Sequence, residues 1–231
     1  MHVLRPAMLG LALMAAMGLA HAAPDVPTTD ARGVAISEAA YPGTIVLDVD
    51  ATDLGQRVFK IRQTVPVRPG LQRFHYPAWL PGNHAASGAI EKLAGLVVTG
   101  NGQRLEWTRD PLDVFTFNVQ VPEGVGELRM DYQFLSPTDA AQGRTVMTPN
   151  MLNLQWIAMV LYPAGHAAHA ITYRASARYP QGWEAASALE VERRDGDTVH
   201  YAPTNLEILV DSPVFAGRYH KTFDLAPSGT R

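Results

Sequence analysis

The chain has 231 residues, with 19 basic and 22 acidic side chains and a formal net charge of −3. This mild acidity, without a basic stripe, argues against nucleic acid as a partner. The chain has no cysteine. This absence excludes disulfides, thiolate catalysis, cysteine metal sites and a lipid-modified cysteine after an export signal.

The first segment is typical of a secretory signal peptide. Arg5 precedes an apolar run of 13 residues, Met8–Ala20, whereas a membrane-spanning helix needs ~20. Ala20-His21-Ala22 has the small-x-small pattern of a cleavage site. We therefore expect residues 1–22 to be a signal peptide cleaved near Ala22, no membrane insertion, and a periplasmic or secreted location. Residues 23–41 are mixed and contain proline, which predicts a flexible leader.

Alternation of apolar and polar residues dominates the sequence after the leader. Leu112–Val121 and Glu127–Phe134 alternate clearly on either side of Pro122–Gly126, which predicts an antiparallel hairpin with one solvated face. Ala85–Leu93 is compatible with a short helical stretch, and Asp195-Gly196 is a hairpin turn pair. Further strands are predicted at Thr44–Val49, Arg57–Val65, Gly95–Val98, Leu154–Leu161, Ile171–Ala177, Leu189–Glu192, Thr198–Tyr201 and Phe215–Leu225.

These patterns predict one all-β domain over residues 42–225. We expect an antiparallel sandwich or saddle-like domain of many short strands, because prolines and glycines interrupt the chain at short intervals. Residues 226–231 are predicted to be a linker or ragged end.

The stretch Phe74–His84 (FHYPAWLPGNH) concentrates aromatic residues, prolines and histidines. Two prolines fix the backbone and a glycine permits a turn, which predicts a stiff, extended corner over Tyr76–Asn83. Tyr76 and Trp79 would anchor this corner on the core, and His84 directly follows it. The alternative is that the corner is a platform that binds peptides or sugars.

The usual catalytic motifs, HExxH, GxSxG, the P-loop and GxGxxG, are absent from the sequence. His166 and His169 have a spacing that suits a metal on a helix, but they follow Pro163–Gly165 in a predicted loop, so we expect two solvated histidines and no metal site. His75 is interpreted as a structural residue. Asp110 and Asp113 could form a carboxylate pair, yet Asp110 before Pro111 is more simply a turn former. A solvated face is expected for Glu106, Glu123, Glu190, Glu192 and Glu207.

Seven ordered stretches carry a resemblance to a known family. They are YPAWLPGNH (76–84), KLAGL (92–96), WTRDPLDV (107–114), FLSPTDAAQGR (134–144), VMTPNMLNLQW (146–156), VLYPAG (160–165) and LVDSPVFAGRY (209–219). Over roughly Tyr41 to Leu225, the chain resembles the N-terminal β domain of the glycyl aminopeptidase family. These are exported bacterial zinc metallopeptidases with a thermolysin-like catalytic domain and a C-terminal PDZ domain.

The resemblance implies a non-catalytic domain. In this family an N-terminal β domain, similar to that of the aminopeptidase N group, packs against the catalytic domain and can help to wall the substrate cleft. The zinc and its HExxH motif belong to the catalytic domain, which this sequence does not contain. We therefore expect no cofactor and no peptidase activity in this chain alone, and a catalytic metallopeptidase domain as its partner, in the same polypeptide or a separate chain.

Within this role, Met147–Trp156 offers candidate substrate contacts. Asn150, Asn153 and Gln155 carry amides that can bind an ammonium or a peptide group, and Trp156 could form an apolar wall. The alternative is that Trp156 belongs to the core and the amides cap turns.

Two other functions stay open at this point. The chain could be a stand-alone periplasmic module that binds peptides or glycans at the aromatic corner, in which case Tyr76 and Trp79 should be exposed beside a groove. It could also be an enzyme with an unrecognised site that includes His75 or His84, which requires polar groups that converge in one pocket. A detached N-terminal domain should instead expose an apolar patch where its catalytic domain docks.

Overall fold

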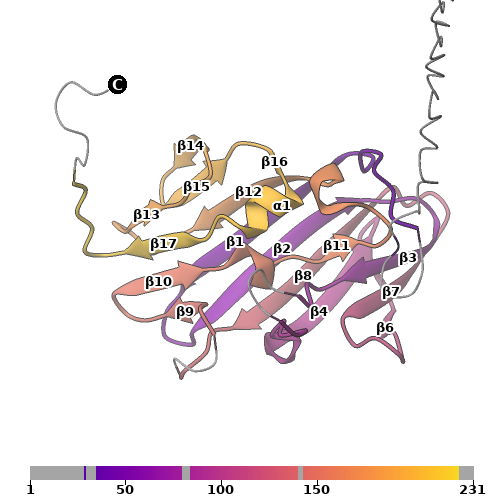
Figure 1. Cartoon of the computed structure of the whole chain (residues 1–231), viewed down its shortest axis with the longest axis horizontal. Helices are drawn as coiled ribbons and strands as arrows, with labels where there is room; N and C mark the ends of the chain where they lie inside the picture. Colours follow the sequence, from indigo (N-terminus) through magenta and orange to yellow (C-terminus); the bar gives the residue numbers. More distant parts are fainter. Residues whose placement is uncertain (1–28, 30–34, 80–83, 140–142, 224–231) are drawn as a thin grey trace, which may run out of the picture.

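The structure is a computed structural model that describes Thr29 and residues 35–79, 84–139 and 143–223. The predicted signal peptide, most of the predicted leader and the predicted linker at residues 226–231 lie outside the described residues. The expectation of an all-β fold is confirmed, since strands dominate the described chain and helices are few and short (Figure 1).

The largest sheet crosses the whole molecule (Figure 1). The parallel pairing of β1 with β12 at its centre, in the register Thr44↔Thr172 to Asp50↔Arg178, differs from the antiparallel prediction. All other pairings in this sheet are antiparallel among the described residues. Its spatial order is β14 (Val191–Asp195), β15 (Thr198–Tyr201), β12 (Thr172–Arg178), β1 (Thr44–Asp53), β2 (Val58–Pro66), β8 (Glu127–Leu135), β4 (Leu93–Gly100) and β5 (Gln103–Leu105), with β16 (Thr204–Asn205) on β12.

Two smaller sheets complete the strand set of the described chain. The first has the order β13 (Glu184–Ala186), β17 (Val214–Gly217), β10 (Met151–Leu154) and β9 (Val146–Met147). The second has the order β11 (Tyr162–Pro163), β3 (Gly70–His75), β7 (Thr116–Val121) and β6 (Trp107–Arg109). In Figure 1 the first smaller sheet lies toward the carboxyl-terminal side and the second on the opposite side.

Alternation along the long strands separates the core from a charged outer face. In β8, Leu128, Met130, Tyr132 and Phe134 are buried while the residues between them are more exposed, as expected for a sheet with one solvated side. Ion pairs cover that outer side, among them Arg62–Asp131 at 3.0 Å and Arg174–Glu192 at 2.7 Å.

The segment after β10 corrects one predicted strand. The apolar run Leu154–Leu161 was expected to be a strand, but β10 ends at Leu154 and the 3-10 helix η3 spans Trp156–Ala158. An apolar run of this length does not distinguish a strand from another buried segment. Side chains bind the backbone here in place of a neighbouring strand: the Tyr132 hydroxyl donates to Met159 O at 2.6 Å, and Gln63 bonds Leu161.

The predicted hairpin over Leu112–Val121 and Glu127–Phe134 is wrong. β7 pairs with β3 and β6, whereas β8 pairs with β2 and β4, so the two strands belong to different sheets. Both strands bury apolar residues, and the five-residue connection between them passes from one sheet to the other. Sequence alternation reports such burial but not which neighbour supplies the hydrogen bonds.

Two other predictions differ from the structure in their bounds, and one helix was missed. The expected helical stretch at Ala85–Leu93 is reduced to the 3-10 helix η1, Ile90–Lys92. The last predicted strand, Phe215–Leu225, corresponds to β17, which ends at Gly217, and its final residues lie outside the described chain. The α-helix α1 (Leu206–Val210) was not predicted, and the 3-10 helix η4 spans Ala168–Ala170. None of the helices in the described ranges is both long and apolar enough to cross a membrane.

Candidate functional site

The aromatic corner has one buried anchor and one exposed ring. Tyr76 is 2% exposed, its backbone N–H donates to Phe115 O at 2.8 Å, and its hydroxyl lies 3.4 Å from Ala158 O. Trp79 is 63% exposed, and His84 is exposed as well. Residues 80–83 of the predicted corner lie outside the described chain. The corner is therefore fixed to the core through Tyr76, while the indole of Trp79 faces the surroundings.

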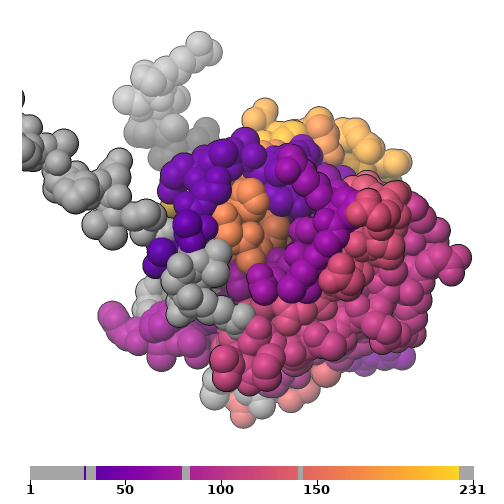
Figure 2. Space-filling model, turned by 90° about the vertical axis from the view of Figure 1, so that its right-hand side faces the viewer, coloured from indigo at the N-terminus to yellow at the C-terminus, as the bar shows by residue number. Residues whose placement is uncertain are grey.

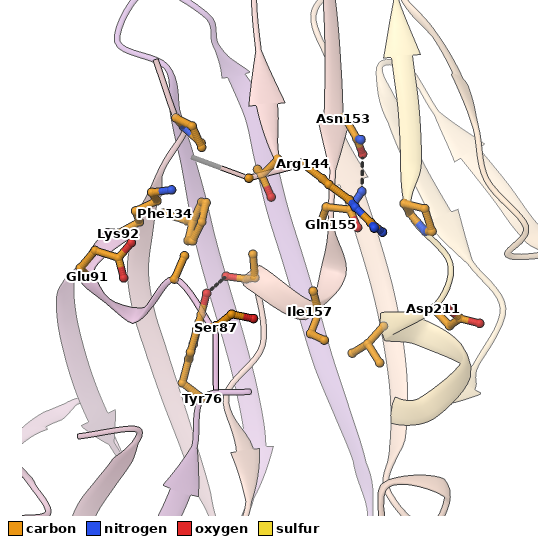
Figure 3. Close-up of a pocket in the computed structure, with 18 of the residues that line it drawn as sticks. Tyr76, Ser87, Glu91, Lys92, Phe134, Arg144, Asn153, Gln155, Ile157 and Asp211 are labelled. Carbon is orange, nitrogen blue, oxygen red and sulfur yellow. Dashed lines mark hydrogen bonds between the residues drawn. The ribbon is translucent and has the colours of Figure 1, made fainter. Parts of the chain in front are cut away.

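Behind Tyr76 lies a hollow of about 1040 Å³, which we call the first hollow (Figure 3). Figure 3 shows Glu91 and Lys92 on one side, and Arg144, Asn153 and Gln155 above. Asp211, beyond the end of α1, lies on the far side, and Phe134 and Ile157 add apolar surface. Carboxylate, cationic and amide groups thus converge around apolar side chains, a composition common in ligand-binding clefts.

The Tyr76 phenol stays neutral on the wall of this hollow. Burial raises the pKa of Tyr76, and the nearby charge of Glu91 raises it further. A neutral phenol can donate a hydrogen bond but supplies no base at neutral pH.

Two of the four predicted substrate contacts lie together in the first hollow. Asn153 is buried on β10, and its Oδ1 accepts a hydrogen bond of 2.8 Å from Gln155 Nε2. Among the residues that the structure describes, Asn153 Nδ2 and Gln155 Oε1 have no hydrogen-bond partner. One donor group and one acceptor group therefore remain for a ligand.

The other two predicted contacts lie elsewhere. Asn150 is exposed in the turn between β9 and β10, where its carbonyl accepts from Arg218 N at 3.0 Å. Trp156 is fully buried, and its ring meets Tyr201 edge-on at 5.8 Å between centroids. Trp156 does not line the first hollow, so the structure brings together only the Asn153–Gln155 half of the set.

Sequence reasoning missed the charged groups around the first hollow. Glu91, Arg144 and Asp211 come from three separate segments, and nothing in the local sequence of Glu91 or Arg144 marks them. The helix α1 did leave a signal, because Asn205 directly before an apolar run is a typical helix N-cap, and its Oδ1 accepts from Ile208 N at 2.9 Å. That signal could have placed Asp211, which follows the helix.

The histidines and aspartates singled out in the sequence have structural surroundings. His169 is exposed and pairs with Glu38 at 2.9 Å, as expected of a solvated histidine. The same expectation is wrong for His166, which is half-buried because its ring packs edge-on against Tyr41 at 5.0 Å. Asp110 is a turn former as predicted, since its Oδ1 accepts from Leu112 N and Asp113 N. The five glutamates assigned to a solvated face are all exposed.

We tested whether the described residues could hold the zinc that the resemblance places in a catalytic domain. No group of three or more His, Asp or Glu side chains in the described ranges is arranged to hold a metal ion. These residues therefore do not fit a zinc centre, and no reaction step is assigned to one here.

A second hollow, of about 320 Å³, lies on the other side of Ile157 and Val210, which line both hollows. Trp79 borders it together with Pro77, Tyr162 and Leu206. Figure 2 shows the molecule from the side on which β3 and β11 lie, where orange residues are recessed within a frame of indigo ones.

Comparison with known proteins places these features in context. Residues 46–218 match the family profile described as the Peptidase M61 N-terminal domain. The fold is similar to that of an aminopeptidase N family protein from Idiomarina loihiensis, with a TM-score of 0.65 at 16% identity over 75% of this chain and 29% of that chain. No curated protein sequence matches significantly.

A second solved structure, a mutant M1 zinc metallopeptidase from Deinococcus radiodurans bound to a Tyr-Ser-Ala substrate, matches more weakly. Its TM-score is 0.46 at 13% identity, over 75% of this chain and 41% of that chain. The chain therefore spans less than half the length of these two structures.

Proposed function

Because the chain belongs to the family of the Peptidase M61 N-terminal domain, we propose that it is the non-catalytic N-terminal domain of a metallo-aminopeptidase-like protein. It packs against a zinc catalytic domain, in the same polypeptide or as a separate chain, and walls part of the substrate cleft. One observation carries this proposal: the first hollow opens beside a sheet face on which apolar side chains are exposed.

That apolar sheet face, which we call the docking face, consists of Met151 on β10 and Phe215 on β17. They are 47% and 55% exposed, although the neighbouring residues Leu152 and Val214 are fully buried. In a sheet with one solvated side, the outward positions are normally polar. Exposed apolar side chains at these positions support a protein partner.

The segment after β17 exposes further aromatic side chains. Tyr219 and Phe223 are 80% and 66% exposed, and they follow β17 directly in the chain. A catalytic domain joined in the same polypeptide would begin close to the docking face. By contrast, the outer face of the largest sheet is covered by ion pairs such as Arg62–Asp131, which suits contact with solvent.

The first hollow supplies the cleft wall in this proposal. Asn153 lies directly opposite Phe215 in the β10–β17 register, so the docking face and the amide pair adjoin. The remaining donor and acceptor of Asn153 and Gln155 match the carbonyl and N–H of a peptide group. The substrate contacts in this proposal are therefore Asn153 and Gln155, and the ligand is a peptide.

No catalytic step is assigned to this chain. Peptide hydrolysis at neutral pH needs a Lewis acid or an activated nucleophile together with a general base. In this proposal the zinc and its ligands belong to the catalytic domain.

The first test is the intact mass of the native protein in its source cells and the identity of anything that co-purifies with it. A mass well above the 25.1 kDa of this chain, or a co-purifying metallopeptidase, is expected. The chain alone, at its own mass less the predicted signal and without a metallopeptidase, would contradict the proposal.

The second test disrupts the docking face in that native protein. Changing both Met151 and Phe215 to Ser should weaken the association with the catalytic domain and lower peptidase activity. Val191→Ser is the matched control, because Val191 is 43% exposed on β14, away from this face. Equal effects of the two sets of variants would argue against a specific docking face.

A further inference from the structure

The second hollow has no part in the proposal above, yet it has the features of a small binding site. Its volume of about 320 Å³ falls at the low end of small-molecule pockets, which measure roughly 300–1,000 Å³. Five separate parts of the described chain line it: Ile36 ahead of β1, the stretch from His75 to Trp79, η3, the β11–η4 segment and α1. A space of this size suits a single side chain rather than an extended ligand.

The corner holds Trp79 in place beside this hollow. The Gly88 N–H donates to Ala78 O at 2.9 Å, and Trp79 forms an isolated antiparallel bridge with Ala86. A Cβ at Gly88 would lie 2.0 Å from Pro77 O, so the two arms of the corner are in close contact. The backbone that carries Trp79 is thus held against residues 86–88, while the residue itself is 63% exposed. A large aromatic ring that is not packed into the core is available to stack on a ligand.

The chemistry of the lining selects a neutral, apolar group. Among the residues that the structure describes, no Asp, Glu, Lys or Arg lines the second hollow. Its walls are apolar or aromatic side chains, with imidazoles as the main polar groups. A charged ligand would lose its hydration without a compensating partner. A sugar would leave several hydroxyl groups unpaired, since few polar side chains are in reach.

The exposed indole distinguishes an aromatic group from an aliphatic one. Offset or edge-to-face contact with Trp79 adds to simple burial only when the ligand is itself aromatic. Tyr162 provides a second ring in the same hollow. We propose that the second hollow binds a neutral aromatic side chain of a peptide, stacked against Trp79.

This inference concerns the chain alone and is tested without a catalytic domain. The purified chain is titrated with N-acetyl-phenylalaninamide, N-acetyl-leucinamide and N-acetyl-glycinamide. Binding is followed by NMR through the indole N–H of Trp79, assigned with Trp79→Phe, and through the methyl groups of Leu206, which lines the second hollow and not the first. We expect saturable shifts with the phenylalanine amide, affinity for the leucine amide about fivefold weaker, and no saturable shifts with the glycine amide.

The variants locate the site. Trp79→Ala should weaken binding of the phenylalanine amide about tenfold, as measured at the Leu206 methyl groups, whereas Trp79→Phe should retain most of it. Tyr219→Ala removes another exposed aromatic residue, 80% exposed, that does not line this hollow. It should leave binding unchanged.

Three outcomes would overturn the inference: no saturation by the aromatic amide, equal affinity for the leucine amide, or binding that survives Trp79→Ala unaltered. None of them bears on the docking face, because no partner takes part in these measurements. Failure of this inference and failure of the proposed function are therefore separable.

Discussion

At the centre of the core, the side chain of Gln63 forms the hydrogen bonds with the backbone of Leu161 that a neighbouring strand would otherwise form. Its Nε2 donates to Leu161 O at 2.5 Å, and its Oε1 accepts from Leu161 N at 3.1 Å. Gln63 is fully buried, on the inner face of β2 where the sequence alternation predicts an apolar residue. Buried backbone groups are costly when unpaired, which explains a polar side chain at this position.

Replacing Gln63 with Leu should be strongly destabilising. The change leaves Leu161 N without its partner and Leu161 O with only the Tyr173 hydroxyl, and we expect the free energy of unfolding to fall by about 3 kcal/mol. Urea unfolding followed by fluorescence measures this. Gln133→Leu is the control, since Gln133 is exposed on β8. A loss of the same size in both variants would mean that Gln63 is not specially required.

Gly88 is required for the close approach within the aromatic corner. Because a Cβ would lie 2.0 Å from Pro77 O, Gly88→Ala should lower the free energy of unfolding by about 1–3 kcal/mol. Gly55→Ala is the control, because a Cβ there meets no atom within 4 Å. Thermal unfolding of both variants checks this expectation. A Gly88→Ala protein as stable as the control would show that the corner can open without cost.

Asn153 should act on substrate binding rather than on folding. In the native protein with its catalytic domain, Asn153→Ala removes a donor in the proposed cleft wall, and KM for a peptide substrate should rise about tenfold, which corresponds to about 1.4 kcal/mol. The thermal midpoint and kcat should change little. A large loss of stability with unchanged KM would assign Asn153 to the core instead.

At the scale of elements, the sequence predicts the long strands β1, β2, β8 and β12, because alternating burial leaves a period-2 pattern, but it misses β3 and most of the shortest strands. The predicted strands at Thr44–Val49 and Thr198–Tyr201 are found, and Asp195-Gly196 does connect β14 and β15. Pairing is harder to predict. β7 and β8 alternate like two arms of one hairpin, yet they belong to different sheets, because alternation reports burial and not the partner strand.

The candidate site was predicted only in part for the same physical reason. Asn153 and Gln155 are close in sequence and could be singled out together, whereas Arg144 and Asp211 reach the first hollow through the tertiary fold. Trp156 could not be assigned from sequence, since an apolar wall and a core residue have the same local pattern. The helix α1 is only five residues long, too short for a periodic signal.

The cap of α1 should determine whether this short helix persists. Asn205→Ala removes the side-chain acceptor of the Ile208 N–H and should cost about 1 kcal/mol in the free energy of unfolding. Asn205→Ser and Asn205→Asp keep a capping oxygen and should stay close to the original protein. Chemical denaturation of the three variants provides the comparison. An Asn205→Ser protein as unstable as Asn205→Ala would rule out the cap as the cause.

At the scale of the whole molecule, buried phenols make the fold sensitive to alkali. In six tyrosines, burial is the main cause that raises the pKa of the side chain above its usual value of 10.0. By contrast, Asp53 and Asp131 are on the surface, and hydrogen bonds lower their pKa values. Lys60 donates to Asp53, whereas Arg129 and Arg62 donate to Asp131. The tyrosines whose pKa is raised are Tyr41, Tyr76, Tyr132, Tyr173, Tyr179 and Tyr201.

The sign of the alkaline effect follows from proton binding. Burial raises the pKa of Tyr41 to about 12 from 10.0, so between these pH values the folded state holds a proton that the unfolded state has lost. The free energy of unfolding therefore falls as pH rises from 10 toward 12 and is unaffected by this group below pH 10. Tyr41→Phe should make that decline shallower.

Tyr41→Phe also removes the hydrogen bond from the Tyr41 hydroxyl to Pro66 O, so at pH 8 it should cost about 1 kcal/mol. Urea midpoints at pH 8 and pH 11 separate the two effects. The gap between the original protein and Tyr41→Phe should narrow at the higher pH. A gap of constant size would show that Tyr41 does not contribute to alkaline unfolding.

The parallel pair at the centre of the largest sheet has a consequence for the order in which this chain folds. Asp48 on β1 accepts a hydrogen bond from Ser176 on β12, 128 positions further along. β2 reaches β1 through a short connection, but the other side of β1 has no partner until residues 172–178 have left the ribosome. Such high contact order predicts refolding in milliseconds to seconds. Until then β1 presents an open edge, on which a second unfinished copy could pair by mistake.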